Sequence, residues 1–244
     1  MPAHHPLAGS KIDAGAATPP LNRPGMSELP LWGKIVFAAV PIIFGITVHE
    51  VAHGWVASRL GDQTARSRGR LTLNPLRHID PVGTVLIPML VLLFSNFHFV
   101  FGWAKPVPVN WRNLNRPRRD MALVAAAGPV ANLLMLVLWA VLFRFILVSG
   151  EQGSLSLLLA YMCQVGILIN IVLMVLNLLP LPPLDGSRVV TSLLPPRLAW
   201  HYAQLERWGL LILVALMFTG ILGKLLLPPV NLLLSVIEQF LSST

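Results

Sequence analysis

The chain has 244 residues, of which 55% are hydrophobic and only 11% are charged. A soluble domain carries charge on about a quarter of its residues, so this composition excludes a typical soluble domain and indicates a membrane protein with several spans. The formal net charge is +8. Cytoplasmic loops of membrane proteins collect Lys and Arg, so the excess is a signal of topology. No basic face with a recognition motif accompanies it, which argues against nucleic-acid binding.

Residues 1–30 are rich in Ala, Pro, Gly and His and lack a periodic apolar pattern, which predicts a disordered N-terminal tail. The tail does not have the pattern of a signal peptide, because the apolar run begins only after it and no small-residue cleavage site follows. The single cysteine, Cys163, lies within an apolar run and has no partner for an intrachain disulfide. Residues 31–244 are therefore expected to form one membrane-embedded domain.

Apolar runs separated by polar loops occupy this domain. The first covers about 31–60 and ends in an arginine-rich loop, 59–80. The second, 82–103, is interrupted by Pro88 and His98. The remaining runs cover about 121–148, 155–179, 205–222 and 225–241. We expect an all-α polytopic membrane protein with about five transmembrane helices.

The first apolar run contains His49, Glu50 and His53 in the pattern H-E-x-x-H. Ionisable groups at membrane depth are costly, so they usually mark a site or a pathway. On a helix, the i, i+4 spacing places both imidazoles on one face, where they can bind one metal ion. Glu50 can then reach a metal-bound water and act as general base. Zinc is the expected metal, because it accepts imidazole, carboxylate and water ligands and lowers the pKa of that water towards neutrality.

A catalytic zinc ion needs a third protein ligand and an open fourth position. The candidates are His98, Asp185 and, at a loop edge, His78 or Asp80. Asp185 is best placed, because NLLPLPPLDG indicates a helix that ends at prolines and exposes a carboxylate at membrane depth. Capping of the following helix is the alternative for Asp185, but an H-E-x-x-H motif in the same membrane favours the ligand. We expect His78 and Asp80 to shape the start of segment 82–103.

Together, HEVAH and NLLPLPPLDG resemble the site-2 protease family of intramembrane zinc metalloproteases, which pairs an H-E-x-x-H helix with a later N-x-x-P-x-x-x-x-D-G segment. Asn177, Pro180, Asp185 and Gly186 fall at that family's spacing. AGPVAN, which ends at Asn132, resembles a further element of some members. The chain has no PDZ-like insertion and is similar to the short prokaryotic branch.

The resemblance implies one zinc ion per chain, with His49, His53 and Asp185 as its ligands and Glu50 as the general base. It implies that residues 31–244 form a metalloprotease domain that hydrolyses peptide bonds within transmembrane segments of other proteins, inside the lipid bilayer. Substrates would be single-pass helices such as anti-sigma-type regulators or remnant signal peptides.

The resemblance also implies that Asn177 and Asn132 steady the substrate peptide or the developing oxyanion. A side-chain amide suits that role, because it can donate a hydrogen bond to a tetrahedral oxygen. A helix–helix hydrogen bond is the alternative for either asparagine, since such bonds are common in membranes.

The zinc ligands also predict topology. The basic loop 59–80 should be cytoplasmic, so the motif of the first helix lies near its inner end and Asp185 must arrive at the same depth. Two crossings before Asp185 achieve this, whereas a third crossing by 82–103 would leave Asp185 on the outer side. We therefore expect 82–103 to be a re-entrant segment, and the site to lie near the cytoplasmic side of the cell (inner) membrane.

Residues 102–110, GWAKPVPVN, alternate with a period of two and contain two prolines, which is typical of an edge strand. One hypothesis is a short β-strand element that pairs with an unwound substrate segment, because strand addition holds a peptide extended. A packed loop is the alternative, and the sequence alone slightly favours it.

Two other functions fit parts of the pattern. A membrane zinc hydrolase of another peptide class would need its third ligand elsewhere, and Glu206 and Glu238 lack a fitting motif. A metal transporter or a non-catalytic scaffold is the non-enzymatic alternative. A transporter should show acidic or histidine residues along several spans, whereas this sequence offers one such cluster.

Overall fold

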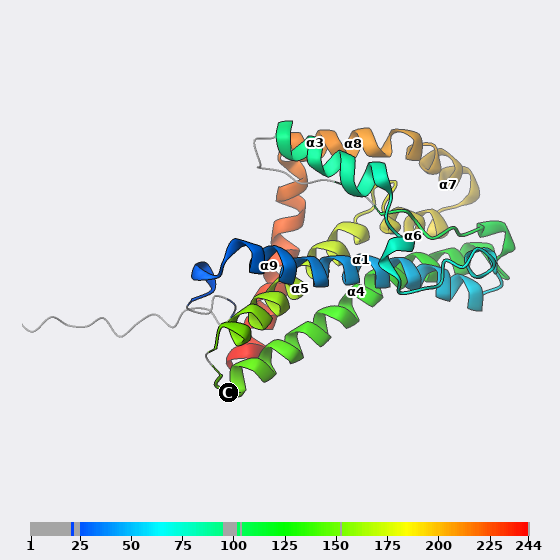
Figure 1. Cartoon of the computed structure of the whole chain (residues 1–244). Coiled ribbons are helices and arrows are strands. Elements are labelled where there is room, and N and C mark those ends of the chain that lie inside the picture. The colour runs from blue at the N-terminus through cyan, green and yellow to red at the C-terminus, as the bar shows by residue number, and fades with distance from the viewer. Residues whose placement is uncertain (1–20, 22–24, 95–101, 103, 152, 244) are drawn as a thin grey trace, which may run out of the picture.

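The computed structural model describes residues 21, 25–94, 102, 104–151 and 153–243, and these residues form helices and loops without a strand (Figure 1). Within the described residues, four helices are long and apolar enough to cross a membrane: α1 (Leu31–Arg59), α4 (Pro117–Val148), α5 (Ser154–Leu178) and α9 (Ile221–Ser242). The protein is thus an all-helical, polytopic membrane protein.

The expected count of about five spans is not confirmed, and the difference lies in 205–241. This region contains α8 (Glu206–Phe218) and α9, which meet at Gly220. Gly220 has φ +72°, a left-handed conformation that interrupts a helix and that glycine adopts without strain. With 13 residues, α8 is roughly 20 Å long at 1.5 Å per residue, short of the ~30 Å hydrocarbon layer.

The core lies where α1, α4 and α5 pack together. Phe143 of α4 and Ile167 of α5 have no exposed surface. Gly166 lets these two helices approach closely, because a Cβ atom there would lie 2.5 Å from the ring of Trp139. Small residues serve this purpose in membrane helices. On the outer face of α4, Phe145 is 74% exposed, which suits contact with lipid.

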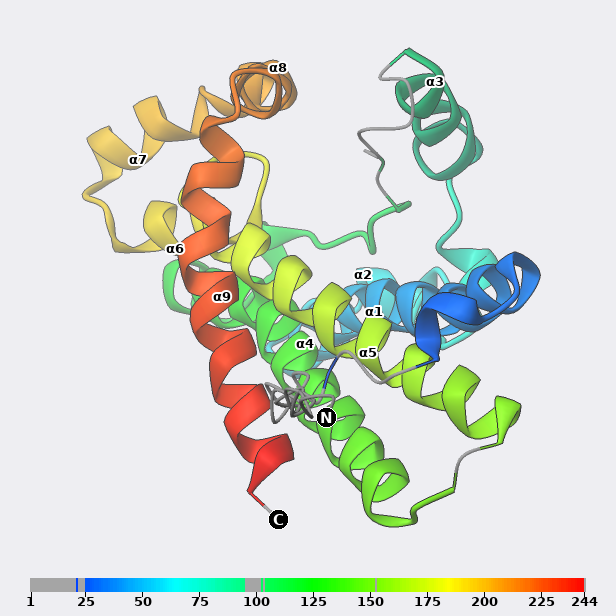
Figure 2. The same cartoon turned by 90° about the vertical axis from the view of Figure 1, so that its left-hand side faces the viewer.

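Short elements connect the long helices. They are η1 (Met26–Glu28), α2 (Thr64–Ser67), η2 (Pro75–Arg77), η3 (Pro81–Leu86), α3 (Ile87–Phe94), η4 (Trp111–Asn113), α6 (Asp185–Leu193) and α7 (Pro196–Ala203). Figure 2 shows η3 and α3 projecting away from the packed helices on one flank, with α6, α7 and α8 on the other.

The excursion through η3 and α3 starts and ends at one place. Lys105 N donates to His78 O at 2.9 Å, so the chain returns beside its point of departure. Asp80 begins the excursion by accepting hydrogen bonds from the amides of Val82 and Gly83. The expectation that His78 and Asp80 shape this start is confirmed. His98, the other ligand candidate, lies outside the described residues.

Segment 104–110 is extended, but the described residues include no strand that pairs with it, so the hypothesised β element is not confirmed. Side chains fix its two ends instead. Arg70 Nη2 donates to Lys105 O at 2.9 Å, and Asp62 accepts from Asn110 N at 2.7 Å.

Most of the expected tail, 1–20 and 22–24, lies outside the described residues. Its last part includes η1, and three apolar side chains there are buried in the core cluster of α4 and α5: Leu21, Met26 and Leu29.

Candidate metal centre

Three of the predicted site residues meet where α1 faces the beginning of α6. The Nε2 atoms of His49 and His53 are 3.1 Å apart. Asp185 Oδ2 lies 3.2 Å from each of them. The three atoms therefore form a nearly equilateral triangle. Among the described residues, no other group of three or more His, Cys, Asp or Glu side chains converges in this way.

This triangle fits a zinc ion. Tetrahedral zinc with bonds of about 2.0–2.1 Å keeps its ligand atoms roughly 3.3 Å apart, close to the observed separations. Asp185 Oδ2 is buried and accepts no hydrogen bond from the described residues. A buried carboxylate oxygen without a donor is costly unless a cation compensates its charge. Two imidazoles and a carboxylate are also a donor set that zinc prefers.

The turn before α6 aims Asp185 at the histidines. Gly186 is required there, because a Cβ atom would lie 2.4 Å from both Leu178 O and Leu179 O at the end of α5. Tyr202 of α7 supports the turn, its hydroxyl donating to Pro180 O at 2.7 Å. α6 has no side-chain cap hydrogen bond. The carboxylate of Asp185 therefore does not cap α6, and the alternative role is not the one it has here.

A residue that the sequence analysis did not single out, Gly128 of α4, faces both imidazoles. A Cβ atom at this position would lie 2.4 Å from His53 Nε2 and 2.6 Å from His49 Nε2. Only glycine leaves room for the two nitrogens to converge. Gly128 belongs to the AGPVAN element, so the signal was present in the sequence.

The Nδ1 atoms of the two histidines have buried partners on α4. His53 Nδ1 lies 2.7 Å from Val124 O, and His49 Nδ1 lies 2.6 Å from Asn132 Oδ1. Because a backbone carbonyl only accepts hydrogen bonds, His53 Nδ1 carries the hydrogen. Its Nε2 atom then keeps the lone pair that a metal requires.

Glu50 lies one position along α1 from His49 and is half-buried. Its Oε2 accepts a hydrogen bond from Val107 N at 2.8 Å. Gly54 allows the extended segment 104–110 to come this close, since a Cβ atom there would lie 2.6 Å from Val107 Cγ1. The backbone of that segment thereby orients the carboxylate of Glu50.

The two predicted asparagines occupy different environments. Asn177, near the end of α5, is half-buried and donates from Nδ2 to Leu173 O at 2.9 Å. Among the described contacts, none joins Asn177 to the metal cluster. Asn132 is fully buried and bonds to His49 and to Asn170 of α5. These contacts are hydrogen bonds between helices, which is the alternative to an oxyanion role for Asn132.

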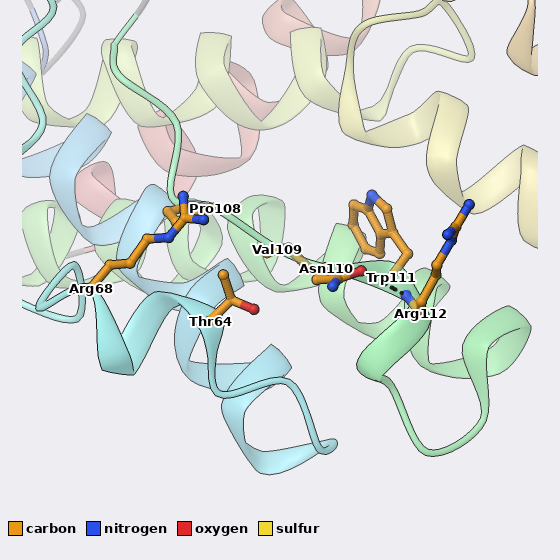
Figure 3. Close-up of a pocket in the computed structure, with 7 residues that line it drawn as sticks. All are labelled: Thr64, Arg68, Pro108, Val109, Asn110, Trp111 and Arg112. Carbon is orange, nitrogen blue, oxygen red and sulfur yellow. Dashed lines mark hydrogen bonds between the residues drawn. The ribbon is translucent and has the colours of Figure 1, made fainter.

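A hollow of about 490 Å³ lies beside segment 104–110 rather than at the metal cluster. Figure 3 shows Arg68 and Arg112 at opposite ends of it, with Trp111 between them. It is lined by Thr64, Arg68, Pro108, Val109, Asn110, Trp111 and Arg112.

Asp62 bonds to two residues that line this hollow, Thr64 and Asn110, and has no exposed surface. Its carboxylate accepts hydrogen bonds from Thr64 N and Oγ1, from Asn110 N and from Asn113 Nδ2. Burial alone would raise the pKa of Asp62, but these hydrogen bonds outweigh it and lower the pKa below its usual range. Asp62 therefore ties the loop after α1 to segment 104–110 as a charged carboxylate.

Comparison with known proteins identifies similar chains. Peptidase family M50 matches residues 145–220, which include Asp185. The zinc metalloprotease YwhC of Bacillus subtilis (strain 168) is 39% identical over 201 residues, covering 80% of this chain and 86% of YwhC. The zinc metalloprotease Rip2 of Mycolicibacterium smegmatis is 30% identical over 192 residues, covering 79% of this chain and 70% of Rip2. No solved structure matches.

Proposed function

Since the chain belongs to peptidase family M50, the site-2 protease family, and is an intramembrane zinc endopeptidase, we propose how it binds its metal and what it cuts. His49, His53 and Asp185 are the zinc ligands and Glu50 is the general base. The observation that carries this assignment is the 3.1–3.2 Å triangle of Nε2, Nε2 and Oδ2 atoms. The buried Oδ2 without a hydrogen-bond donor supports it independently.

A zinc ion at this triangle supplies a water of lowered pKa and polarises the scissile carbonyl. Glu50 accepts a proton from the attacking water and returns it to the leaving nitrogen. The amide of Val107 keeps one carboxylate oxygen of Glu50 in place, which leaves the other for the water. Asn177 donates to the developing oxyanion once its amide turns away from Leu173 O.

The substrates are single-pass transmembrane segments, such as anti-sigma-type regulators or remnant signal peptides, cut near the cytoplasmic side of the cell membrane. Two features support this location. The loop that follows α1 is rich in arginine, and the bond between Lys105 N and His78 O closes the excursion through α3 on the side where it began. That closure favours a re-entrant segment over a fifth crossing.

Segment 104–110 lies beside Glu50 and is extended, which suits strand addition by a substrate peptide. Most of its amides are already used, however. Pro106 and Pro108 have no N–H, and the amides of Lys105, Val107 and Asn110 donate within the protein. Arg70 already donates to the carbonyls of Lys105 and Pro106. A substrate would therefore pair with Val109 N and with the remaining carbonyls, so Val109→Pro should slow cleavage if strand addition occurs.

The direct test of the proposed mechanism uses purified protein, a helical membrane substrate and the variant Glu50→Gln. This variant should bind zinc as wild type does and lose cleavage, because an amide cannot accept the proton. Glu28→Gln, at an exposed position in η1, is the matched control and should cut normally. Wild-type cleavage by zinc-loaded Glu50→Gln would refute the assigned base.

A further inference from the structure

Behind the metal cluster, a series of hydrogen bonds crosses three helices. Asn170 Nδ2 donates to Gly166 O within α5 at 2.8 Å. Asn132 Nδ2, on α4, donates to Asn170 Oδ1 at 2.8 Å. Asn132 Oδ1 then lies 2.6 Å from His49 Nδ1 on α1. Both asparagines have no exposed surface, so water does not compete for these bonds.

The carbonyl of Gly166 sets the direction of the whole series. It can only accept, so Asn170 turns Nδ2 towards Gly166 and Oδ1 towards Asn132. Asn132 must then offer Nδ2 to Asn170 and Oδ1 to His49. The carbonyl of Gly45, 3.5 Å from Asn132 Nδ2, favours the same orientation. His49 Nδ1 therefore faces an acceptor, carries the hydrogen, and leaves the lone pair on Nε2.

We propose that Asn170 is a positioning residue for the metal: acting through Asn132, it holds His49 in the tautomer and orientation whose Nε2 can bind zinc. This inference rests on the proposed role of His49 as a zinc ligand. With the amides reversed, Asn132 would donate to Nδ1, and the hydrogen of His49 would sit on Nε2, where it blocks metal binding.

His53 provides an internal reference. It obtains the same tautomer directly from Val124 O at 2.7 Å and has no contact with the asparagine pair among the described hydrogen bonds. Loss of Asn170 should therefore disturb one of the two imidazoles and spare the other. A general loosening of the helices would disturb both.

The test uses the full chain in detergent micelles and the variant Asn170→Leu, with zinc affinity measured by competition with a chelator. Hydrogen-bond partners of histidine ligands are worth about 10–100-fold in metal affinity, and we expect a loss in that range. Nitrogen NMR of ¹⁵N-histidine in the metal-free protein should show the Nδ1–H form of His49 depleted and that of His53 retained.

Ile171→Ala is the matched control, because Ile171 neighbours Asn170 on α5 and is equally buried. It opens a cavity and lowers the melting temperature, but should keep wild-type zinc affinity. If Asn170→Leu does not fold, Asn170→Asp decides, since it keeps an oxygen facing Asn132 Nδ2 and should retain the Nδ1–H form of His49.

Wild-type zinc affinity with an unchanged His49 spectrum in Asn170→Leu would overturn the proposal. An equal loss of affinity in Ile171→Ala would also overturn it, because packing would then explain the effect. His49→Ala tests the underlying assignment separately. If that variant binds zinc as tightly as wild type, His49 is not a ligand, whatever the result at Asn170.

Discussion

Two aspartates, Asp62 and Asp185, show how hydrogen bonding separates a structural carboxylate from a candidate metal ligand. Asp62, which ties the loop after α1 to segment 104–110, is fully buried and accepts four hydrogen bonds from three residues. Asp185 has a side chain that is 20% exposed, yet its buried Oδ2 accepts no hydrogen bond and faces two imidazoles. Burial is therefore a poor guide to function, whereas a buried oxygen without a hydrogen-bond donor suits a cation as its partner.

The largest effect that distinguishes the two carboxylates is expected from Asp185→Ala. If Asp185 binds zinc as proposed, zinc affinity should fall by more than about 100-fold, since losing a ligand costs more than losing a hydrogen-bond partner of a ligand. Cleavage should then become undetectable. The melting temperature of the metal-free protein should stay the same or rise, because the variant removes a carboxylate oxygen that has no donor. Chelator competition and thermal unfolding after zinc removal measure the two quantities.

Stoichiometric zinc binding by Asp185→Ala would contradict the proposed difference between Asp185 and Asp62. The same difference would be contradicted if the metal-free variant unfolded at a much lower temperature than metal-free wild type, which would make Asp185 a structural residue like Asp62.

Asp62→Ala should show the opposite pattern. It removes the buried acceptor that Thr64, Asn110 and Asn113 share, so the free energy of unfolding should fall by roughly 1–3 kcal/mol. Zinc affinity should stay within about threefold of wild type, because Asp62 ties the loop after α1 to segment 104–110 and shares no described hydrogen bond with the metal cluster. Reversible unfolding in mixed micelles and the same chelator competition are the measurements. A loss of zinc without a loss of stability would contradict the structural role.

The metal centre was more predictable than the network that holds it. His49 and His53 share a helix face by local geometry, and the N-x-x-P-x-x-x-x-D-G pattern identified Asp185 without any knowledge of packing. Asn170, in contrast, appears in the sequence as one amide in an apolar run. Its role depends on which helices α5 contacts, and only the assembled α1, α4 and α5 place its partners beside it.

Some helix and strand assignments also depended on contacts that the sequence does not show. The apolar run 205–222 has the composition of a span, but the left-handed residue Gly220 and the short helix before it depend on how the chain turns into α9. Segment 104–110 has the alternation of a strand, yet its amides bond to Glu50, Asp62 and His78 O, partners that are distant in sequence.

The smallest predicted effect concerns pH and again separates the two carboxylates. The folded-state pKa of Asp62 is lowered. The charged carboxylate is therefore more stable in the folded protein than in the unfolded chain, where an aspartate has a pKa of about 3.9. Its stabilisation is therefore complete above that value and is lost as the pH falls towards the lower folded-state pKa. The melting-temperature difference between wild type and Asp62→Asn should be constant from about pH 7 to 5 and shrink below about pH 4. Measuring this difference at one fixed zinc concentration cancels the pH dependence of the metal centre, because both proteins share it. A difference that stayed constant or grew below about pH 4 would mean that the hydrogen bonds of Asp62 do not favour its charged form.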